Sequence, residues 1–177
     1  MNTAGSTLRE FKDVLTLDPS TVEERHGRGF LLQWIPDGED ADEPDGLEDD
    51  TFVGEPTHAD TMPRLNAIDE TNFRVYPLRT NNRGNRCIVG RDDSCDIVID
   101  DRSISRRHAE LEFDEEGRLR VFDHGSTNGT LVARRPVFDG DSATIEFGKS
   151  VQFGQIKMTF MPVRQFADFI RLVSGEF

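Results

Sequence analysis

IVGRDDSCDIVIDDRSISRRHAELEF, residues 88–113, and DHGSTNGTLV, residues 123–132, are the stretches that decide the fold. Both alternate short apolar runs with turn-forming clusters of Gly, Asp, Asn and Ser, and neither has the spacing of an amphipathic helix. The same pattern extends over residues 73–161, through the runs FRVYPL, RLRVFDH, ATIEFG and VQFGQIKMTFMP. Many short strands separated by turns predict a mainly β fold, an all-β sandwich.

Helices are expected on both sides of this β region. The segments TLREFKDVLTL, residues 7–17, and VRQFADFIRLVSGEF, residues 163–177, repeat apolar residues at helical spacing. Asp18-Pro19 is expected to end the first helix and Gly175 the last. The run FLLQWI is apolar enough to be buried, as a strand or as a helical turn. The predicted organisation is an N-terminal extension, helical or mixed (1–35), a flexible acidic linker (36–72), the sandwich domain (73–161) and a C-terminal helix (162–177).

The net charge of −13 is concentrated in one segment. Residues 36–60 hold eleven acidic residues and no Lys or Arg, whereas residues 74–161 hold fourteen of each sign. An acidic segment punctuated by Pro and Gly is typical of chain that cannot bury enough surface to order itself. The balanced β region lacks the basic excess that binding to a nucleic-acid backbone requires, so nucleic acid is not an expected partner.

The remaining composition argues for a soluble cytoplasmic protein without cofactors. No apolar run approaches the roughly 18 residues of a membrane helix, and the first residues lack the pattern of a secretory signal. Cys87 and Cys95 are too few for a disulfide framework and have no zinc-site partners at suitable spacing. We therefore expect reduced thiols, with no metal, no cofactor and no membrane partner.

Three motifs of the β region follow one another in a characteristic order. The first stretch contains a Gly-Arg turn and a Ser-x-x-His segment, the second contains GSTNGT, and a weaker match, DGDSATIEFG, occupies residues 139–148. Together they resemble the forkhead-associated (FHA) domain, over about residues 73–161. The resemblance implies an FHA-type β-sandwich that binds phosphothreonine peptides, in a small bacterial signalling protein with a single FHA domain.

The residues themselves suit a phosphate ligand. A phosphate group carries about two negative charges and three acceptor oxygens, so a metal-free site needs a guanidinium, hydroxyl donors and backbone N–H groups. Arg91 follows Gly90 directly after a strand, so it can project from a tight turn at the end of a sheet. Ser105 lies in a polar loop in which residues 102–107 include three arginines.

The resemblance assigns roles by position. It implies phosphate contacts from Arg91, Ser105, Arg106 and Thr127, a peptide-backbone contact from Asn128, and structural support from Gly90, His108 and Gly129. The hairpin after this motif departs from the family, because an Asn-Gly turn is common there and this chain has Ala133-Arg134-Arg135-Pro136. The preference for residues after the phosphothreonine therefore does not carry over. As a specificity loop, Arg134 and Arg135 would favour acidic residues there, and they are equally well explained as exposed turn charges.

Other interpretations of the same residues remain. Arg91 could form a surface ion pair with Asp92, Asp93 or Asp96. Ser105 and His108 could be read as a nucleophile and a base, but no acid, glycine elbow or set of oxyanion donors accompanies them, so we expect no enzyme. The run SRRH could contact nucleic acid.

The linker contains threonines that could become ligands of the same chain. Thr51 follows three acidic residues, and Thr57 has an acid three residues later, a position that FHA domains often read. We hypothesise that a Ser/Thr kinase phosphorylates Thr51 or Thr57 and that the modified linker binds the phosphate site. The simpler explanation is a solubilising acidic spacer.

The sequence thus predicts a phosphothreonine-peptide binding module, a signalling adaptor downstream of a Ser/Thr kinase. The alternative is a phospho-independent scaffolding protein that uses the FHA fold and the flanking helices for protein contacts.

Overall fold

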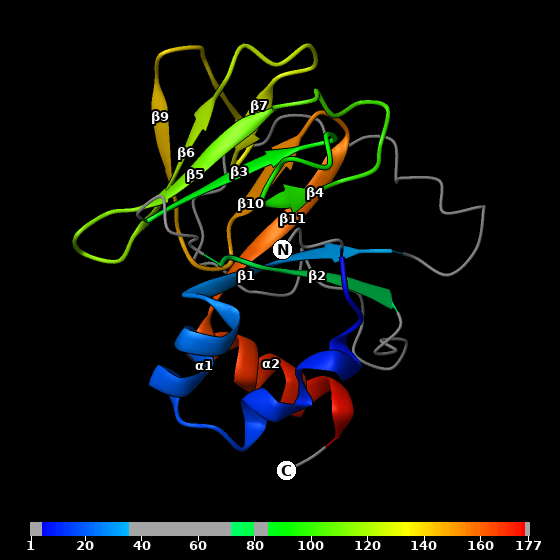
Figure 1. Cartoon of the computed structure of the whole chain (residues 1–177), viewed down its shortest axis with the longest axis vertical. Coiled ribbons are helices and arrows are strands. Elements are labelled where there is room, and N and C mark those ends of the chain that lie inside the picture. The colour runs from blue at the N-terminus through cyan, green and yellow to red at the C-terminus, as the bar shows by residue number, and fades with distance from the viewer. Residues whose placement is uncertain (1–4, 36–71, 80–84, 176–177) are drawn as a thin grey trace, which may run out of the picture.

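Two β-sheets pack face to face in the computed structural model, which describes residues 5–35, 72–79 and 85–175 (Figure 1). One sheet has the strand order β2-β1-β11-β10-β7-β8 and the other β4-β3-β5-β6-β9. The strands are β1 (Gly29–Trp34), β2 (Phe73–Pro77), β3 (Arg86–Gly90), β4 (Ile97–Val98), β5 (Ala109–Phe113), β6 (Leu119–Asp123), β7 (Thr130–Val132), β8 (Arg135–Val137), β9 (Ser142–Ile145), β10 (Ser150–Phe153) and β11 (Ile156–Pro162). The expected mainly β sandwich with flanking helices is confirmed.

The core between the sheets follows the alternation of the strands. In β5, Ala109, Leu111 and Phe113 are buried in this core, whereas Glu110 and Glu112 lie on the outer face. This period of two is expected of a strand that has one face on the core and one toward solvent. Burying each large apolar side chain contributes about 1.5–3 kcal/mol, so the core holds the two sheets together and positions the loops at their ends.

Strand β1 is buried on both faces. Leu31 belongs to the core between the sheets, and Phe30 and Leu32 belong to a second cluster on the other side. Burial on both sides explains why three successive residues of this strand, Phe30, Leu31 and Leu32, are apolar. Because β1 lies between β2 and β11, a domain that starts at residue 73 leaves out one strand of the sheet.

A helical layer covers the outer face of this sheet at β1 and β2 (Figure 1). It consists of the 3-10 helix η1 (Leu8–Leu15), α1 (Pro19–His26) and α2 (Val163–Ser174). Phe166 of α2 stacks on Phe30 of β1 with ring centroids 3.8 Å apart, and Phe11 of η1 packs edge-on against both rings. The aromatic contacts join the two terminal segments of the chain to the sheet.

The helix boundaries differ in part from those predicted. The N-terminal helix is a 3-10 helix with a break at Phe11 (φ −111°, ψ 16°), and it ends before Asp18 as expected. Pro19 then starts a second helix, α1, in a segment for which the sequence predicted no element. Asp18 caps this helix, because its side chain accepts the Thr21 N–H at 3.1 Å. Proline fits this position because the first helical N–H has no partner within the helix. Helix α2 stops at Gly175, which is in the left-handed conformation, as predicted.

The β7–β8 hairpin has a strained turn. Ala133 and Arg134 form its two central positions, with φ values of 47° and 66°. This is the backbone conformation that Asn-Gly adopts most readily. For residues with a Cβ atom, a left-handed conformation costs roughly 1–2 kcal/mol each. Ala133-Arg134 therefore adopts the turn conformation that suits Asn-Gly, and this lowers the stability of the fold.

Several sequence expectations concern other parts of the molecule. Thr51 and Thr57 lie outside the described residues. Cys87 and Cys95 are buried free thiols, and burial, with Asp96 nearby, raises the pKa of Cys87 to about 12. Within the described ranges, no helix is long and apolar enough to cross a lipid bilayer.

Candidate functional site

Four connections between strands meet at one end of the sandwich. Strands β3, β6 and β10 end there, and β5, β7 and β11 begin there. The connections are residues 91–96, 99–108, 124–129 and 154–155, and backbone hydrogen bonds join the first to the second and the third to the fourth. The sheet topology therefore brings the separate sequence motifs into one place.

The Gly90-Arg91 turn packs against the following loop. The Arg91 N–H donates to the carbonyl of Ser105 at 3.0 Å. A Cβ atom at Gly90 would lie 2.2 Å from the carbonyl oxygen of Arg106 and 2.7 Å from Sγ of Cys95. Only glycine allows this close approach of two backbones, and the approach sets the Arg91 side chain beside Ser105.

His108 joins two of the loops. Its Nδ1 accepts the backbone N–H of Ser105 at 3.1 Å, and its Nε2 donates to the carbonyl of Gly129 at 3.0 Å. Burial lowers the pKa of His108, although the bond to Gly129 and the Asp123 carboxylate oppose the shift, so the ring is neutral with the proton on Nε2. Gly129 has a φ of +77°, which favours glycine at this position.

The hydrogen bonds of His108 also decide whether Ser105 and His108 could act as a nucleophile and a base. His108 contacts the backbone N–H of Ser105 and not its hydroxyl, and both ring nitrogens are occupied by scaffold bonds. A serine nucleophile needs its hydroxyl within hydrogen-bond reach of the base. Ser105 and His108 are therefore not arranged as a nucleophile and a base.

An open cavity of about 280 Å³ lies where the loops meet. Its walls are Arg91, Arg102, Ser103, Ile104, Ser105, Arg106, Thr127 and Asn128. The Thr127 N–H donates to Oγ of Ser105 at 3.0 Å, so the two hydroxyl-bearing residues are held next to each other. The residues predicted to contact phosphate and the peptide backbone thus all line one cavity.

The guanidinium groups at this cavity form no ion pair with a described carboxylate, although the charges of Arg106 and Asp92 are close enough to interact. The ion pairs that join arginines to carboxylates within the described residues involve Arg25, Arg86, Arg118 and Arg171, all remote from this cavity's lining. Arg91, Arg102 and Arg106 form no ion pair there, so the alternative that Arg91 pairs with Asp92, Asp93 or Asp96 does not hold in this structure. The cavity is a positively charged surface, which attracts anions.

Comparison with known proteins identifies the family. A model of the FHA domain matches residues 87–154. The oxoglutarate dehydrogenase inhibitor of Corynebacterium efficiens is 34% identical over 112 residues, which cover 59% of this chain and 72% of that protein. The chain belongs to the FHA domain family.

Other relatives of this FHA protein match a shorter region. The glycogen accumulation regulator GarA of Mycolicibacterium smegmatis is 45% identical over 73 residues, 41% of this chain and 44% of GarA. The chain thus spans less than half the length of that relative. Among solved structures, the FHA domain of the CT664 protein from Chlamydia trachomatis aligns with 75% of this chain and 96% of its own, with 22% identity and a TM-score of 0.48.

The predicted specificity loop of this FHA protein is not at the cavity. Ala133, Arg134 and Arg135 follow the three residues of β7, so they lie about 10 Å along the strand from its start. The Ala133 N–H donates to the carbonyl of Ser150, at the end of β10 remote from the site. Neither Arg134 nor Arg135 lines the cavity, because β7 separates the GSTNG loop from the hairpin turn.

Asp123 is a residue of the FHA site that the sequence interpretation missed. Its buried carboxylate accepts the N–H and the hydroxyl of Ser126, at 2.8 and 2.7 Å, and the hydroxyl of Thr130 at 2.6 Å. Burial alone would raise the pKa of Asp123, but these hydrogen bonds lower it, so the group is ionised. Asp123 fixes both ends of the loop that carries Thr127 and Asn128, and an acid directly before HGSTNG was the available signal.

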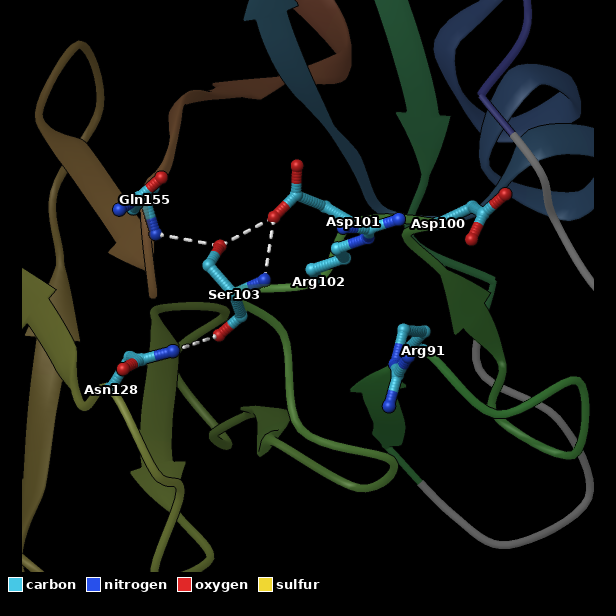
Figure 2. A pocket seen from close by; sticks show the side chains of 7 residues that line it. All are labelled: Arg91, Asp100, Asp101, Arg102, Ser103, Asn128 and Gln155. Carbon is cyan, nitrogen blue, oxygen red and sulfur yellow. Dashed lines mark hydrogen bonds between the residues drawn. The ribbon is translucent and has the colours of Figure 1, made fainter.

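Ser103 was missed as well, and it connects three loops (Figure 2). Its hydroxyl donates to Asp101 at 2.6 Å and accepts the N–H of Gln155 at 3.0 Å. Its carbonyl accepts the side-chain amide of Asn128 at 2.8 Å. A Cβ atom at Gly154 would lie 2.5 Å from that carbonyl oxygen, so the β10–β11 turn is in direct contact with the loop. The signal was weak, because a serine in a polar loop is ordinary.

Proposed function

We propose that this FHA protein binds a phosphothreonine-bearing protein or peptide and acts as a signalling adaptor downstream of a Ser/Thr protein kinase, without catalysing a reaction. The observation that carries the proposal is the convergence of Arg91, Arg106, Ser105 and Thr127 on one open cavity whose guanidinium groups form no ion pair among the described residues. Such a surface supplies the charge and the donors that a phosphate dianion requires.

Each group has a distinct task in the proposed complex. Arg91 offers a guanidinium fork to two phosphate oxygens, and Arg106 adds charge from the neighbouring loop. Ser105 Oγ accepts the Thr127 N–H at 3.0 Å and donates its own proton to Thr127 Oγ1 over a long 3.5 Å contact. A phosphate oxygen, as a stronger acceptor, would take over that proton. Thr127 provides a second hydroxyl beside Ser105. Each charge-assisted hydrogen bond contributes about 1.5–3 kcal/mol.

Asn128 suits a contact with the peptide backbone. Its Nδ2 donates to the carbonyl of Ser103, which fixes the orientation of the amide. The Oδ1 atom is then the free acceptor for an N–H of the bound peptide. A peptide held by its backbone at Asn128 and by its phosphate at Arg91 would bind across the cavity in one orientation.

The names of two relatives support a regulatory role. One is called a glycogen accumulation regulator and the other an oxoglutarate dehydrogenase inhibitor. By analogy, the partner of this chain is a protein whose activity changes when it is bound, and the kinase controls which phosphothreonine is present.

The linker is proposed as a second ligand. The register of β1 and β11 puts Trp34 at the end of the sheet where β11 begins, and Phe73 pairs with Trp34. Both ends of the linker therefore emerge at the same end of the sandwich as the phosphate cavity. A tethered phosphothreonine at Thr51 or Thr57 would have an effective concentration in about the millimolar range, which allows it to compete with partners.

A phosphopeptide array on the wild-type protein and Arg91→Ala tests the main proposal. The backbone bond from residue 91 to Ser105 remains in the variant, so the turn is preserved. We expect a loss of about 2–4 kcal/mol, roughly 30- to 1000-fold in affinity. Arg134→Ala, which removes the same charge away from the cavity, should bind like the wild type. Binding that ignores phosphate and survives Arg91→Ala would instead support the phospho-independent scaffold.

A further inference from the structure

A second cavity, of about 720 Å³, is lined by the side chains drawn in Figure 2. It adjoins the 280 Å³ cavity at which we propose that phosphate binds. The two share Arg91, Arg102, Ser103 and Asn128 as walls. The larger cavity adds Asp100, Asp101 and Gln155, which do not line the smaller one. A peptide whose phosphate occupies the smaller cavity and whose backbone crosses Asn128 would extend into the larger one. An extended chain advances about 3.3 Å per residue, so the residue that enters lies within a few positions of the phosphothreonine.

One wall of this cavity is preformed. Ser103 is only 8% exposed, and its hydrogen bonds to Asp101, Gln155 and Asn128 join the β4–β5 loop to two others. The N–H of Ser103 also donates to Asp101 Oδ1 at 2.8 Å, so one carboxylate oxygen takes both bonds. A wall held in this way needs little ordering when a ligand binds, which favours selectivity.

The carboxylates of this cavity are available to a ligand. Hydrogen bonds from Ser103 lower the pKa of Asp101, so the group is ionised. Both of these bonds go to Oδ1, and no described residue donates to its Oδ2. Neither Asp100 nor Asp101 forms an ion pair within the described ranges, although Arg102 also lines the cavity.

The balance of charge changes once phosphate is bound. The smaller cavity then uses Arg91 to neutralise the phosphate. The groups left in the larger cavity are the single positive charge of Arg102 and the two negative charges of Asp100 and Asp101. An acidic peptide side chain would meet a net negative surface there, and a basic one would find partners.

We propose that the cavity lined by Asp100, Asp101 and Gln155 is a specificity subsite that takes a lysine or arginine side chain of the phosphothreonine peptide. The proposal rests on the proposed function. Asp101 and Asp100 provide the charge, and the Gln155 side chain, which is exposed at the cavity, provides a neutral acceptor. The carboxylates thus distinguish peptides that share a phosphothreonine.

An oriented phosphothreonine peptide library, with lysine and alanine compared at each of the four positions on either side, tests this with the full chain. We expect lysine to be enriched at one position. Affinity for that peptide should exceed its alanine counterpart by roughly three- to tenfold, more at low salt than at high salt.

The variants Asp100→Asn and Asp101→Asn should each reduce that preference while binding the alanine peptide as the wild type does. Asn at position 101 keeps an oxygen acceptor for Ser103, so the wall is retained. Asp168→Asn changes the net charge equally at an exposed site on α2, and it should leave the preference intact. Phosphothreonine binding without a basic preference, or with an acidic one, overturns the subsite alone. Failure of every phosphothreonine peptide to bind overturns the proposed function with it.

Discussion

The buried ring of His108 accepts the backbone N–H of Ser105 at 3.1 Å, three residues before it in the chain. The other ring nitrogen donates to Gly129, in a different loop. One neutral imidazole thus sets the distance between the loops that carry Ser105 and Thr127. The positions of Ser105 and Thr127, which are proposed to contact phosphate, therefore depend on His108, which is not proposed to contact it.

Replacing His108 by alanine should reduce both stability and phosphopeptide affinity. The change leaves the N–H of Ser105 and the carbonyl of Gly129 without their partner, and it opens a cavity. We expect a loss of about 2–4 kcal/mol in the free energy of unfolding, measured by urea denaturation. Affinity should fall even at temperatures where the variant is folded. Unchanged affinity in a folded variant would show that the loops hold their positions without the ring.

The protonation of His108 predicts a pH dependence of stability. Its pKa is lowered below the ordinary 6.5 by burial, so the unfolded chain binds a proton that the folded chain does not. The stabilisation is therefore complete above about pH 6.5 and declines as the pH falls through the window below it. Compared with the wild type, His108→Gln should lose less unfolding free energy between pH 7.5 and pH 5.5. The two proteins differ only at residue 108, so a parallel pH profile for the two would contradict the prediction.

Asp123→Asn should destabilise the loop that carries Thr127 and Asn128. Both carboxylate oxygens accept hydrogen bonds from donors, and an amide nitrogen in place of one oxygen faces a donor instead. The expected cost is about 2–3 kcal/mol in unfolding free energy, with weaker phosphopeptide binding. Asp139→Asn, at an exposed position, is the matched control and should stay within about 0.5 kcal/mol of the wild type.

The double substitution Ala133→Asn and Arg134→Gly should stabilise the protein. The turn already has positive φ values at both positions, which Asn-Gly adopts with little strain. We expect a gain of about 1 kcal/mol or more in unfolding free energy. Phosphopeptide affinity and preference should not change, because the turn is at the other end of β7. A shift in the preference for acidic downstream residues would show that the hairpin takes part in specificity, as the sequence predicts.

Phosphorylation of the linker should compete with peptide binding. After incubation with a cognate Ser/Thr kinase, mass spectrometry should locate phosphate on Thr51 or Thr57, and titration with a phosphothreonine peptide should show weaker apparent affinity. The Thr51→Ala and Thr57→Ala variants identify which threonine is responsible. Equal affinity before and after phosphorylation would leave the linker as a spacer.

The sequence predicted the sandwich well because its strands are short, alternating and separated by turn residues. It also predicted one shared site for Arg91, Ser105 and Thr127, since the motifs that carry them occur in a characteristic order. Asp123 and Ser103 were not predicted, because their importance comes from hydrogen bonds between loops that are distant in sequence. The helix that starts at Pro19 was not predicted because its polar sequence has little periodicity. In the structure it is stabilised by the Asp18 N-cap and by the burial of Val22 and His26 on one face.

Strand β1 precedes the linker in the sequence, whereas both of its neighbours in the sheet, β2 and β11, follow the linker. Trp34 pairs with Phe73, and the Ile35 N–H donates to the Asn72 carbonyl at 2.7 Å, so the two edges of the linker are held together by the fold. A protease that cuts the linker would therefore leave two fragments associated. The N-terminal fragment, with Phe30, Leu31 and Leu32 as its buried anchor, would behave as a subunit that can be added back in trans to rebuild the sheet.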